Sequence, residues 1–420
     1  MLGQHWIERA ILFLGFLDLF DALSWVVPIA VILLLSRHNW RISLSSMYLS
    51  IAISMASRLG ILVHPSFSYR AILLILALLL LIIHPLIVFP PLTGPYHVGC
   101  ITTQLNGVDV RIFHPCVKQG ATSDLISYLE WRNTPKGIAK YSKMPSVLLS
   151  HMSSFRLRSY RKTPVSDQAV HHPVIIFSHG LAGTFEIYSS LVEEWASRGF
   201  ITVAINHADG SAAAFRSPDS GLPELYVNLD DSIPMIEQRR AQLAIRVDEV
   251  QKVLTALIDG QHDSSLMIDT NAVFMIGHSF GATTALASAH VDERFKAVVA
   301  LDLWGQPLPE TVLSPGSRLI TVPILHVVSD TWRSPSWYDE FRSRVNVGNS
   351  QIWHAKGALH ASFSDVYLYS PILLQLSGRS PSAPTEQVLS ATTELSSSFI
   401  LGTLDKSSFY NQYPFMKEED

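Results

Sequence analysis

Gly277-His278-Ser279-Phe280-Gly281 is the stretch of sequence that decides the fold. An apolar run precedes it at 272–276 and small residues follow it at 282–287, so we expect a strand, a sharp turn and a helix. A serine at such a turn has a strained backbone and an accessible hydroxyl, and the two glycines avoid collisions with the neighbouring strand and helix. The pattern predicts a nucleophile elbow with Ser279 as the nucleophile. The alternative is an ordinary strand-to-helix turn.

A nucleophilic serine needs a base, an acid that orients the base, and donors for an oxyanion. In a sheet with such an elbow, the acid and the histidine follow the serine in the chain, each at the end of a later strand. Asp302 and Asp330 each end an apolar run, and His360 follows the last strand-like piece. Both aspartates therefore remain candidates for the acid. His278 is not expected to be the base, because adjacent side chains at the elbow point apart.

Strands and helices alternate upstream of the elbow. Apolar runs at 174–177 and 200–206 read as strands, and the amphipathic patterns at 185–198 and 237–258 read as helices. An earlier segment, 98–114, reads as a hairpin that turns at an Asn-Gly pair. Alternation of this kind predicts a mostly parallel sheet with helices on both faces and an active site at the carboxyl ends of the strands.

Composition limits the classes of function. The net charge of -4 argues against general binding of nucleic acid. Two cysteines, Cys100 and Cys116, are too few for a disulfide framework or a zinc cluster. They could pair in an oxidising compartment, but two reduced thiols are an equal expectation.

The first 92 residues carry much of the hydrophobicity. Apolar segments at 10–35, 43–63 and 71–89 predict two or three membrane-spanning helices, with three preferred, and hence a multi-pass integral membrane protein. Arg58 makes the middle segment the weakest of the three. The distribution of arginines gives no orientation, because the two sides are nearly balanced.

Two acids lie within the first apolar segment. Asp18 and Asp21 are three residues apart and would share one face of a helix. They could serve a function, but we expect them to turn towards neighbouring helices or lipid headgroups.

A basic, amphipathic insertion is expected at about 121–170. Eight Lys or Arg residues and no acids occur between Arg132 and Lys162, with apolar residues interleaved. The pattern fits either a surface against anionic lipid headgroups or a solvated helical layer over the sheet.

Five segments together resemble the successive signatures of the platelet-activating-factor acetylhydrolases, a family with plasma-type and intracellular type II members. The segments are Ser178-His179-Gly180-Leu181, His207-Ala208-Asp209-Gly210-Ser211-Ala212, Gly277-His278-Ser279-Phe280-Gly281, Ala300-Leu301-Asp302-Leu303-Trp304 and His360-Ala361-Ser362-Phe363-Ser364-Asp365. The likeness runs from about residue 96 to about residue 404. Ala182 and Ala282 depart from it, because glycine is expected at both positions.

The resemblance implies an α/β-hydrolase fold and a role for each site residue. Ser279 would be the nucleophile, His360 the general base and Asp302 the acid, with Asp330 as the alternative acid. The backbone amides of Leu181 and Phe280 would bind the oxyanion, and His179 would shape the oxyanion loop. The resemblance implies no metal ion, and nothing in the sequence indicates a metal, nucleotide or flavin cofactor.

The whole sequence predicts a membrane-anchored serine esterase that cleaves short or oxidised sn-2 acyl groups of phospholipids without calcium. We expect a membrane region at 1–92 and an α/β-hydrolase domain at 93–420, with phospholipid substrate and membrane lipids as partners. The alternatives are a broader lipid or carboxyl-ester hydrolase, an acyltransferase, and a catalytically silent membrane scaffold.

Overall fold

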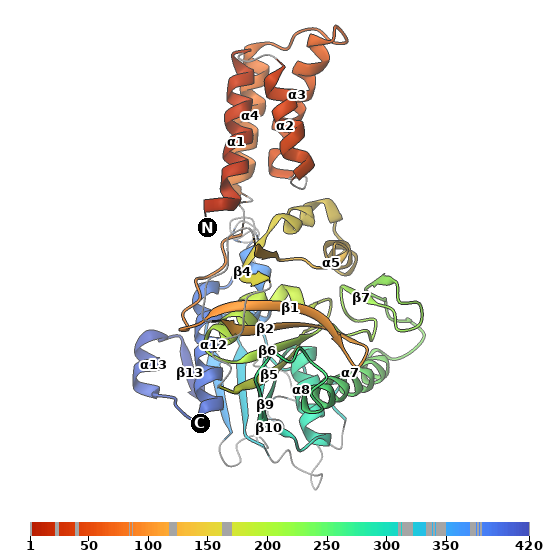
Figure 1. Ribbon diagram of the computed structural model, residues 1–420, viewed down its shortest axis with the longest axis vertical. Helices are drawn as coiled ribbons and strands as arrows, with labels where there is room; N and C mark the ends of the chain where they lie inside the picture. Colours follow the sequence, from red (N-terminus) through yellow and green to blue (C-terminus); the bar gives the residue numbers. More distant parts are fainter. Residues whose placement is uncertain are drawn as a thin grey trace.

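The computed structural model of the chain has a helical region at one end and an α/β body at the other (Figure 1). It describes all residues except 1, 22–24, 38–41, 84, 86, 117–123, 162–169, 310–311, 313–321, 333–337, 339–340, 342–349, 370–374, 376–377, 379 and 420.

One large sheet organises the α/β body. In spatial order the strands of the described residues run β13-β12-β11-β10-β9-β5-β6-β2-β1-β4-β3. The six from β12 to β6 are parallel, whereas β13 and β2 pair antiparallel at either side. The bounds are β1 His97–Leu105, β2 Val108–Cys116, β3 Leu125–Ser127, β4 Arg156–Arg161, β5 His172–Ser178, β6 Ile201–Ile205, β9 Ile268–His278, β10 Phe295–Leu301, β11 Ile324–Ser329, β12 Gln351–Ala355 and β13 Met416–Glu419.

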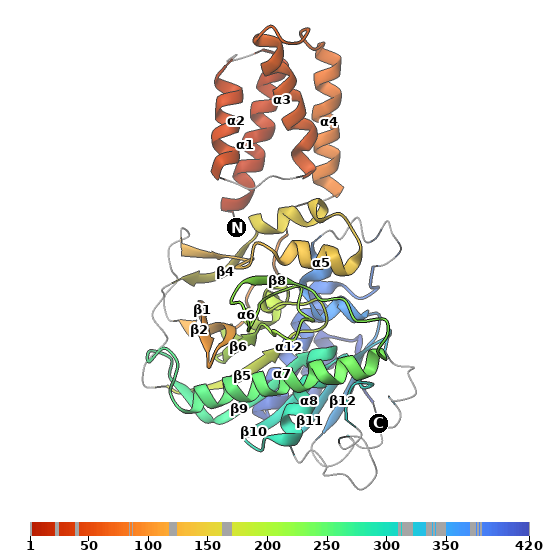
Figure 2. The ribbon, with the colours of Figure 1, turned by 90° about the vertical axis from the view of Figure 1, so that its right-hand side faces the viewer.

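The central strands are apolar on both faces because helices cover both. In β5, Val174 and Ile176 belong to one hydrophobic core, and Ile175 and Phe177 belong to the other. Helices α7 and α8 cover the first core, and α6 and α12 cover the second (Figure 2). The helix bounds are η4 Phe185–Tyr188, α6 Ser189–Ser197, α7 Met235–Ile258, α8 Phe280–Val291, η5 His360–Phe363, η6 Asp365–Leu368, α12 Thr385–Leu401 and α13 Lys406–Gln412. The predicted mostly parallel sheet with helices is confirmed.

The predicted hairpin is also present. Strands β1 and β2 pair from His97 with Cys116 to Leu105 with Val108. Asn106 and Gly107 join them with φ values of 47° and 81°, the left-handed conformation that an Asn-Gly turn favours. This register places Cys100 opposite Phe113, and the two buried cysteines do not form a disulfide.

The basic insertion forms a layer of mixed structure. It contains β3, α5 Thr134–Ser142, η3 Ser146–Ser154 and β4, and β4 extends the sheet by pairing parallel with β1. A short two-stranded sheet, β7 Ala214–Arg216 and β8 Pro223–Leu225, lies near α5.

Two buried glutamates anchor this layer to the segment after β5. Glu186 accepts hydrogen bonds from the amides of residues 130 and 131 and from the hydroxyl of Thr134. Glu193 pairs with the guanidinium of Arg158 at 2.9 Å and accepts from the Ser159 hydroxyl at 2.5 Å. Because both carboxylates are fully buried, these bonds satisfy groups that water cannot reach.

The described residues of the N-terminal region form a bundle of four helices. These are α1 Leu2–Leu19, α2 Val26–Arg37, α3 Ser45–Arg58 and α4 Phe67–Ile83, with the short η1 Ile42–Leu44 before α3. Their common core includes Ile11, Val31, Met47, Ile51 and Ala77. The bundle contacts the α/β body where η1 meets η3.

The predicted membrane spans are not supported, and the prediction of a multi-pass integral membrane protein is wrong. Among the described residues, no helix combines the length and apolar character needed to cross a bilayer. The apolar segment 10–35 divides between α1 and α2, and α4 ends two residues before Pro85. At about 1.5 Å per residue, α2 and α3 reach only about 18 and 21 Å, short of the roughly 30 Å of a hydrocarbon core.

An ion network joins three helices of the bundle. Asp18 in α1 accepts from the Ser54 hydroxyl at 2.7 Å and pairs with Arg58 of α3 at 2.9 Å. The Asp21 carboxylate accepts hydrogen bonds from both terminal nitrogens of Arg70 in α4, at 2.8 and 3.1 Å. The two acids therefore turn towards neighbouring helices, as the spacing of Asp18 and Asp21 led us to expect.

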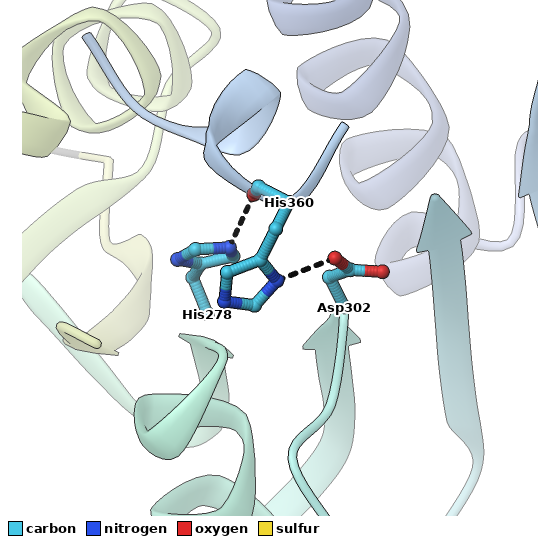
Figure 3. A group of neighbouring side chains, drawn as sticks. All are labelled: His278, Asp302 and His360. Atoms are coloured by element: carbon cyan, nitrogen blue, oxygen red, sulfur yellow. Dashed lines mark hydrogen bonds and ion pairs between the residues drawn. The ribbon is translucent and has the colours of Figure 1, made fainter. Parts of the chain in front are cut away.

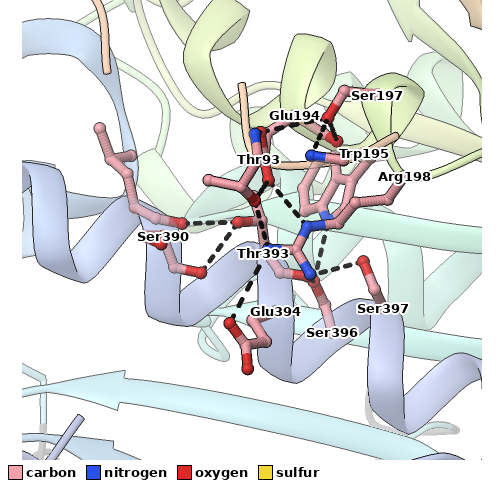
Figure 4. Close-up of polar contacts among 12 residues, drawn as sticks. Thr93, Glu194, Trp195, Ser197, Arg198, Ser390, Thr393, Glu394, Ser396 and Ser397 are labelled. Carbon is pink, nitrogen blue, oxygen red and sulfur yellow. Dashed lines mark hydrogen bonds and ion pairs between the residues drawn. The ribbon is translucent and has the colours of Figure 1, made fainter. Parts of the chain in front are cut away.

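The segment that leads from the bundle into β1 is fixed to α6 (Figure 4). The amide of Thr93 donates to Glu194 at 3.0 Å, and the guanidinium of Arg198 donates to the Thr93 hydroxyl at 2.8 Å. The amide of Gly94 donates to the Ser197 hydroxyl, and a Cβ at Gly94 would lie 2.1 Å from the Ser197 carbonyl oxygen. Only glycine permits this close approach.

Candidate active site

The elbow has the strained geometry that its sequence predicts. Ser279 lies between β9 and α8 with φ 58° and ψ -119°, a conformation rarely adopted by residues with a side chain. A Cβ at Gly277 would lie 2.0 Å from the carbonyl oxygen of Gly281, and a Cβ at Gly281 would lie 2.0 Å from that of Ser178. The two glycines therefore allow the strand, the turn and β5 to approach one another closely.

The structure brings Ser279, His360 and Asp302 together. His360 Nε2 lies 2.9 Å from Ser279 Oγ, and His360 Nδ1 lies 2.5 Å from Asp302 Oδ2. Asp302 follows β10 and is completely buried, whereas 29% of the His360 side chain is exposed. The backbone amide and hydroxyl of Ser329 both donate to Asp302, at 2.7 and 2.8 Å. These contacts fix the Asp302 carboxyl group against the imidazole of His360.

Asp330, the alternative acid, lies elsewhere. One of its carboxylate oxygens is 2.6 Å from Nε2 of His354, and the other accepts the amide of Gly357 at 2.9 Å. Its own amide donates to the carbonyl of Ala358, so the residue supports the loop that leads to His360. The geometry pairs Asp302, and not Asp330, with the His360 ring.

The predicted oxyanion loop, residues 179–184, follows β5. A Cβ at Gly180 would lie 3.1 Å from Cβ of Ser279, so this loop passes directly over the elbow. Ala182 adopts φ 52°, and its amide donates to the carbonyl of Ser211 at 2.8 Å. Alanine thus occupies a left-handed position that glycine would occupy without strain. Phe280 opens α8, where the first amides have no partner within the helix and favour negative charge.

A buried polar network supports the oxyanion loop from below. Arg246 of α7 donates to the carbonyl of His179 at 2.6 Å, to Asp209 at 2.8 Å and to the Ser211 hydroxyl at 2.6 Å. Burial of the Asp209 carboxyl raises its pKa, but the charge of Arg246 acts in the opposite direction. The pKa of Asp209 lies below its usual value. His179 and His207 both have pKa values held well below normal by burial.

The pair of His207 and Glu249 closes this network. His207 bonds Glu249 at 2.6 Å through one ring nitrogen and the Ser178 hydroxyl at 2.7 Å through the other. Burial raises the pKa of the Glu249 carboxyl to about 8 and lowers that of His207, so burial favours the neutral form of both groups. The expected role of His179 in shaping the oxyanion loop stays a prediction, although its carbonyl and ring both lie within the network.

His278, Asp302 and His360 have the spacing of a possible metal site (Figure 3), with ligand atoms within 4.8 Å of one another. Each ring nitrogen already has a hydrogen-bond partner, however. His278 Nε2 contacts the carbonyl of His360 at 2.8 Å, and Nδ1 contacts the Tyr188 hydroxyl at 2.9 Å. A metal ion would have to displace these bonds and those of His360.

Several neighbours of the site were not found by sequence reasoning. Ser329, Tyr188, Thr331 and Trp332 all contact the site or its supports, and the ring of Trp332 lies 5.0 Å from that of His360. Ser329 could have been identified from the sequence, since it is the last residue of the strand beside Asp302. The others depend on loop conformations that no local pattern specifies.

Comparison with known proteins identifies the family. A sequence profile described as platelet-activating factor acetylhydrolase, isoform II, matches residues 82–420. The chain belongs to this family. It is 27% identical over 309 residues to the platelet-activating factor acetylhydrolase of Canis lupus familiaris, covering 66% of this chain and 68% of the relative. It is 25% identical over 364 residues to that of Cavia porcellus, covering 79% and 81%.

A solved structure supports the fold of this acetylhydrolase-family chain. The ferulic acid esterase from Streptomyces cinnamoneus superposes with a TM-score of 0.58 at 16% identity, over 80% of this chain and 99% of the esterase. The α/β-hydrolase fold is therefore confirmed. Together with the family match, it identifies the protein as a serine hydrolase of carboxylic esters.

Proposed function

We propose that the protein hydrolyses short or oxidised sn-2 acyl groups of phospholipids without calcium, with Ser279 as nucleophile, His360 as general base and Asp302 as acid. The observation that carries the proposal is the continuous hydrogen-bonded line from Ser279 Oγ through both nitrogens of His360 to the buried Asp302. The substrate class is supported by the two relatives, which are named platelet-activating factor acetylhydrolases.

The reaction proceeds in two halves. His360 Nε2 accepts the proton of Ser279 as its oxygen attacks the ester carbonyl, and Asp302 stabilises the imidazolium through Nδ1. The amides of Leu181 and Phe280 bind the oxyanion. Collapse releases the lysophospholipid, whose sn-2 oxygen takes the proton from His360. Water then gives a proton to His360 and attacks the acyl-enzyme, and the short acid leaves as the hydroxyl of Ser279 is restored.

Calcium independence follows from the proposed oxyanion site. In this mechanism two backbone amides and a helix N-terminus, and no cation, stabilise the negative charge. Activity is therefore expected to be the same with EDTA and with added calcium.

The first test compares two phosphatidylcholines in detergent with EDTA, one with an sn-2 acetyl group and one with sn-2 palmitoyl. The native chain should cleave the acetyl substrate and leave the palmitoyl substrate intact. Ser279→Ala should lose about 10⁶-fold in kcat. Ser264→Ala, at an exposed serine outside the site, is the matched control and should keep full activity.

The outcomes separate the alternatives. Equal cleavage of both substrates would replace the proposed specificity with a general lipid or carboxyl-ester hydrolase. Transfer of the acetyl group to an added lipid alcohol in preference to water would identify an acyltransferase. Activity that persists in Ser279→Ala would overturn the assignment of the nucleophile.

We also propose that residues 93–420 form the catalytic domain and that 1–92 form a separate helical region. The four-helix bundle has its own hydrophobic core, which supports a separate helical region, whereas Ile87 and Phe89, after the last helix, belong to a core of the sheet.

A further inference from the structure

Three loops must meet at the elbow for the proposed reaction. They carry the oxyanion donor Leu181, the nucleophile Ser279 and the base His360. The contacts of the triad hold His360 to the elbow and to Asp302, but they do not reach the oxyanion loop. A second set of contacts does reach it, through the side chains of Tyr188 and His278.

The direction of each hydrogen bond in this second set is determined. The carbonyl oxygen of His360 can only accept, so His278 donates to it from Nε2 at 2.8 Å. In a neutral ring Nδ1 is then the acceptor, and it accepts a hydrogen bond from the Tyr188 hydroxyl at 2.9 Å. The oxygen of Tyr188 in turn accepts the amide of Gly180 at 3.1 Å. One unbroken chain therefore runs from the oxyanion loop to the base loop.

The His278 ring is neutral in this environment. It is 4% exposed, and burial together with the nearby His360 charge holds its pKa well below the usual value. The two rings lie 4.7 Å apart with an interplanar angle of 38°. A neutral ring can donate from one nitrogen and accept at the other, whereas a protonated ring would lose its bond from Tyr188 and repel the imidazolium of His360.

The Tyr188 side chain is held in place independently of the chain of hydrogen bonds. It is 3% exposed, and its ring centroid lies 4.9 Å from that of Phe177 in β5. A Cβ at Gly180 would lie 3.1 Å from the Tyr188 hydroxyl oxygen and 3.1 Å from Cβ of Ser279. The oxyanion loop is thus packed between the tyrosine and the nucleophile, with no space to drift towards either.

We propose that Tyr188 and His278 are positioning residues that hold the oxyanion loop and the base loop at a fixed separation across Ser279. The inference rests on the proposed roles of Leu181 and His360, and it deepens them. The tetrahedral intermediate must meet the Leu181 amide and His360 Nε2 at the same time. Misplacing a reacting group by about 1 Å can cost about 100-fold in rate, so a link between the two loops has a catalytic effect without touching substrate.

The test uses the full chain and p-nitrophenyl acetate, whose hydrolysis does not depend on phospholipid specificity. Tyr188→Phe removes both of its hydrogen bonds and keeps the ring. We expect kcat per active site, titrated with a fluorophosphonate, to fall about 10- to 100-fold, with KM changed by less than about twofold. A fall in the titrated fraction alone, with unchanged kcat per site, would show a merely structural role and overturn the proposal.

Non-additivity provides the second readout. His278→Gln keeps a donor near the position of Nε2 but loses the acceptor for Tyr188. If both residues act as one chain, the double variant with Tyr188→Phe should be within about threefold of the worse single variant. Multiplied losses would mean that the two residues act independently, and would overturn the link between the loops.

A matched pair at position 278 keeps the test decisive if Tyr188→Phe does not fold. Glutamine places its amide nitrogen near Nε2 and can still donate to His360, whereas the shorter asparagine reaches only the Nδ1 position. Each substitution breaks one of the two links, so both variants should lose about 10- to 100-fold in kcat. Native kcat in either variant would contradict the proposal.

Failure of the positioning role can be told apart from failure of the proposed mechanism. If Ser279→Ala is inactive while the variants at 188 and 278 retain native kcat, only the positioning role is wrong. If Ser279→Ala remains active on the same ester, the proposed triad itself is wrong.

Discussion

Two buried aspartates, one in the helical bundle and one in the α/β body, are similarly buried but pair with different basic side chains. Asp18 in the bundle and Asp302 in the active site are 1% and 0% exposed, and each accepts a serine hydroxyl. Asp18 also pairs with the guanidinium of Arg58, and Asp302 with the imidazole of His360. A guanidinium keeps its proton at all accessible pH values, whereas an imidazole exchanges one near neutrality. The first pair is suited to holding helices together and the second to moving a proton.

The largest expected effect comes from changing the Asp302–His360 pair. Asp302→Asn should keep the shape of the site and lower kcat by about 10⁴-fold, because the amide cannot stabilise the imidazolium. Asp330→Asn is the matched control, since Asp330 pairs with His354, and it should change kcat by less than about 10-fold. Steady-state kinetics on the acetyl substrate measures both. A larger loss in Asp330→Asn would reverse the assignment of the acid.

Breaking the Asp18–Arg58 pair should lower the stability of the fold and leave kcat unchanged. Asp18→Asn removes the carboxylate that lies 2.9 Å from the largely buried Arg58 and should lower the free energy of unfolding by about 3 kcal/mol. The value of kcat should be unchanged. Urea unfolding followed by circular dichroism measures the first quantity, and exposed Asp219→Asn serves as the control. A loss of kcat with unchanged stability would show that the bundle takes part in catalysis.

A third buried acid sharpens the comparison because its hydrogen bonds come from neutral groups. Asp365 is completely buried and accepts the amide of Ser190 and the hydroxyl of Tyr128, each at 3.2 Å. Burial raises its pKa from 3.8 to about 7. The raised pKa stabilises the folded state fully below about pH 4, and this contribution is lost as the pH rises towards 7. Thermal unfolding from pH 4 to 7 should therefore show a smaller decline in Asp365→Asn than in the native chain. Parallel curves would contradict this prediction.

The smallest effect is expected at Asp21, whose side chain is 47% exposed. The hydrogen bonds from Arg70 lower the pKa of its carboxyl. A lowered pKa stabilises the folded state above about pH 4, and the contribution is lost as the pH falls through the folded value. Asp21→Asn should cost less than about 1 kcal/mol near pH 7, because exposed ion pairs contribute little. The difference in urea midpoint should shrink further in 1 M salt; a difference that grows with salt would rule out an electrostatic origin.

The catalytic elements could be predicted because their signals are local. The elbow needs glycines at 277 and 281 whatever surrounds it, since a Cβ at either position would lie 2.0 Å from a backbone carbonyl oxygen. Asp302 and His360 could be placed because Asp302 directly follows β10 and His360 lies five residues after the end of β12, and the ends of parallel strands meet at one edge of the sheet. Local sequence could not decide between Asp302 and Asp330 as the acid. It depends on His354 lying 2.6 Å from Asp330, a contact between residues 24 positions apart.

In the N-terminal region, local sequence patterns predicted less of the structure. Hydropathy detected apolar segments correctly but not the ends of the helices, because the break between α1 and α2 and the stop before Pro85 depend on backbone conformation. The partners of Asp18 lie 36 and 40 residues away on α3. The roles of Tyr188 and His278 were equally hidden, because the chain that joins them spans residues 180 to 360.

The two buried glutamates that anchor the basic insertion limit how this fold can be recombined. Glu186 and Glu193 belong to the segment after the oxyanion loop, while most of their hydrogen-bond donors lie in 130–159. A chimaera that replaces the insertion alone would leave Glu193 without these donors and Glu186 with only the Thr184 hydroxyl, and burying an unpaired carboxylate costs several kcal/mol. Exchanges between relatives should therefore take the insertion and the segment after the loop together.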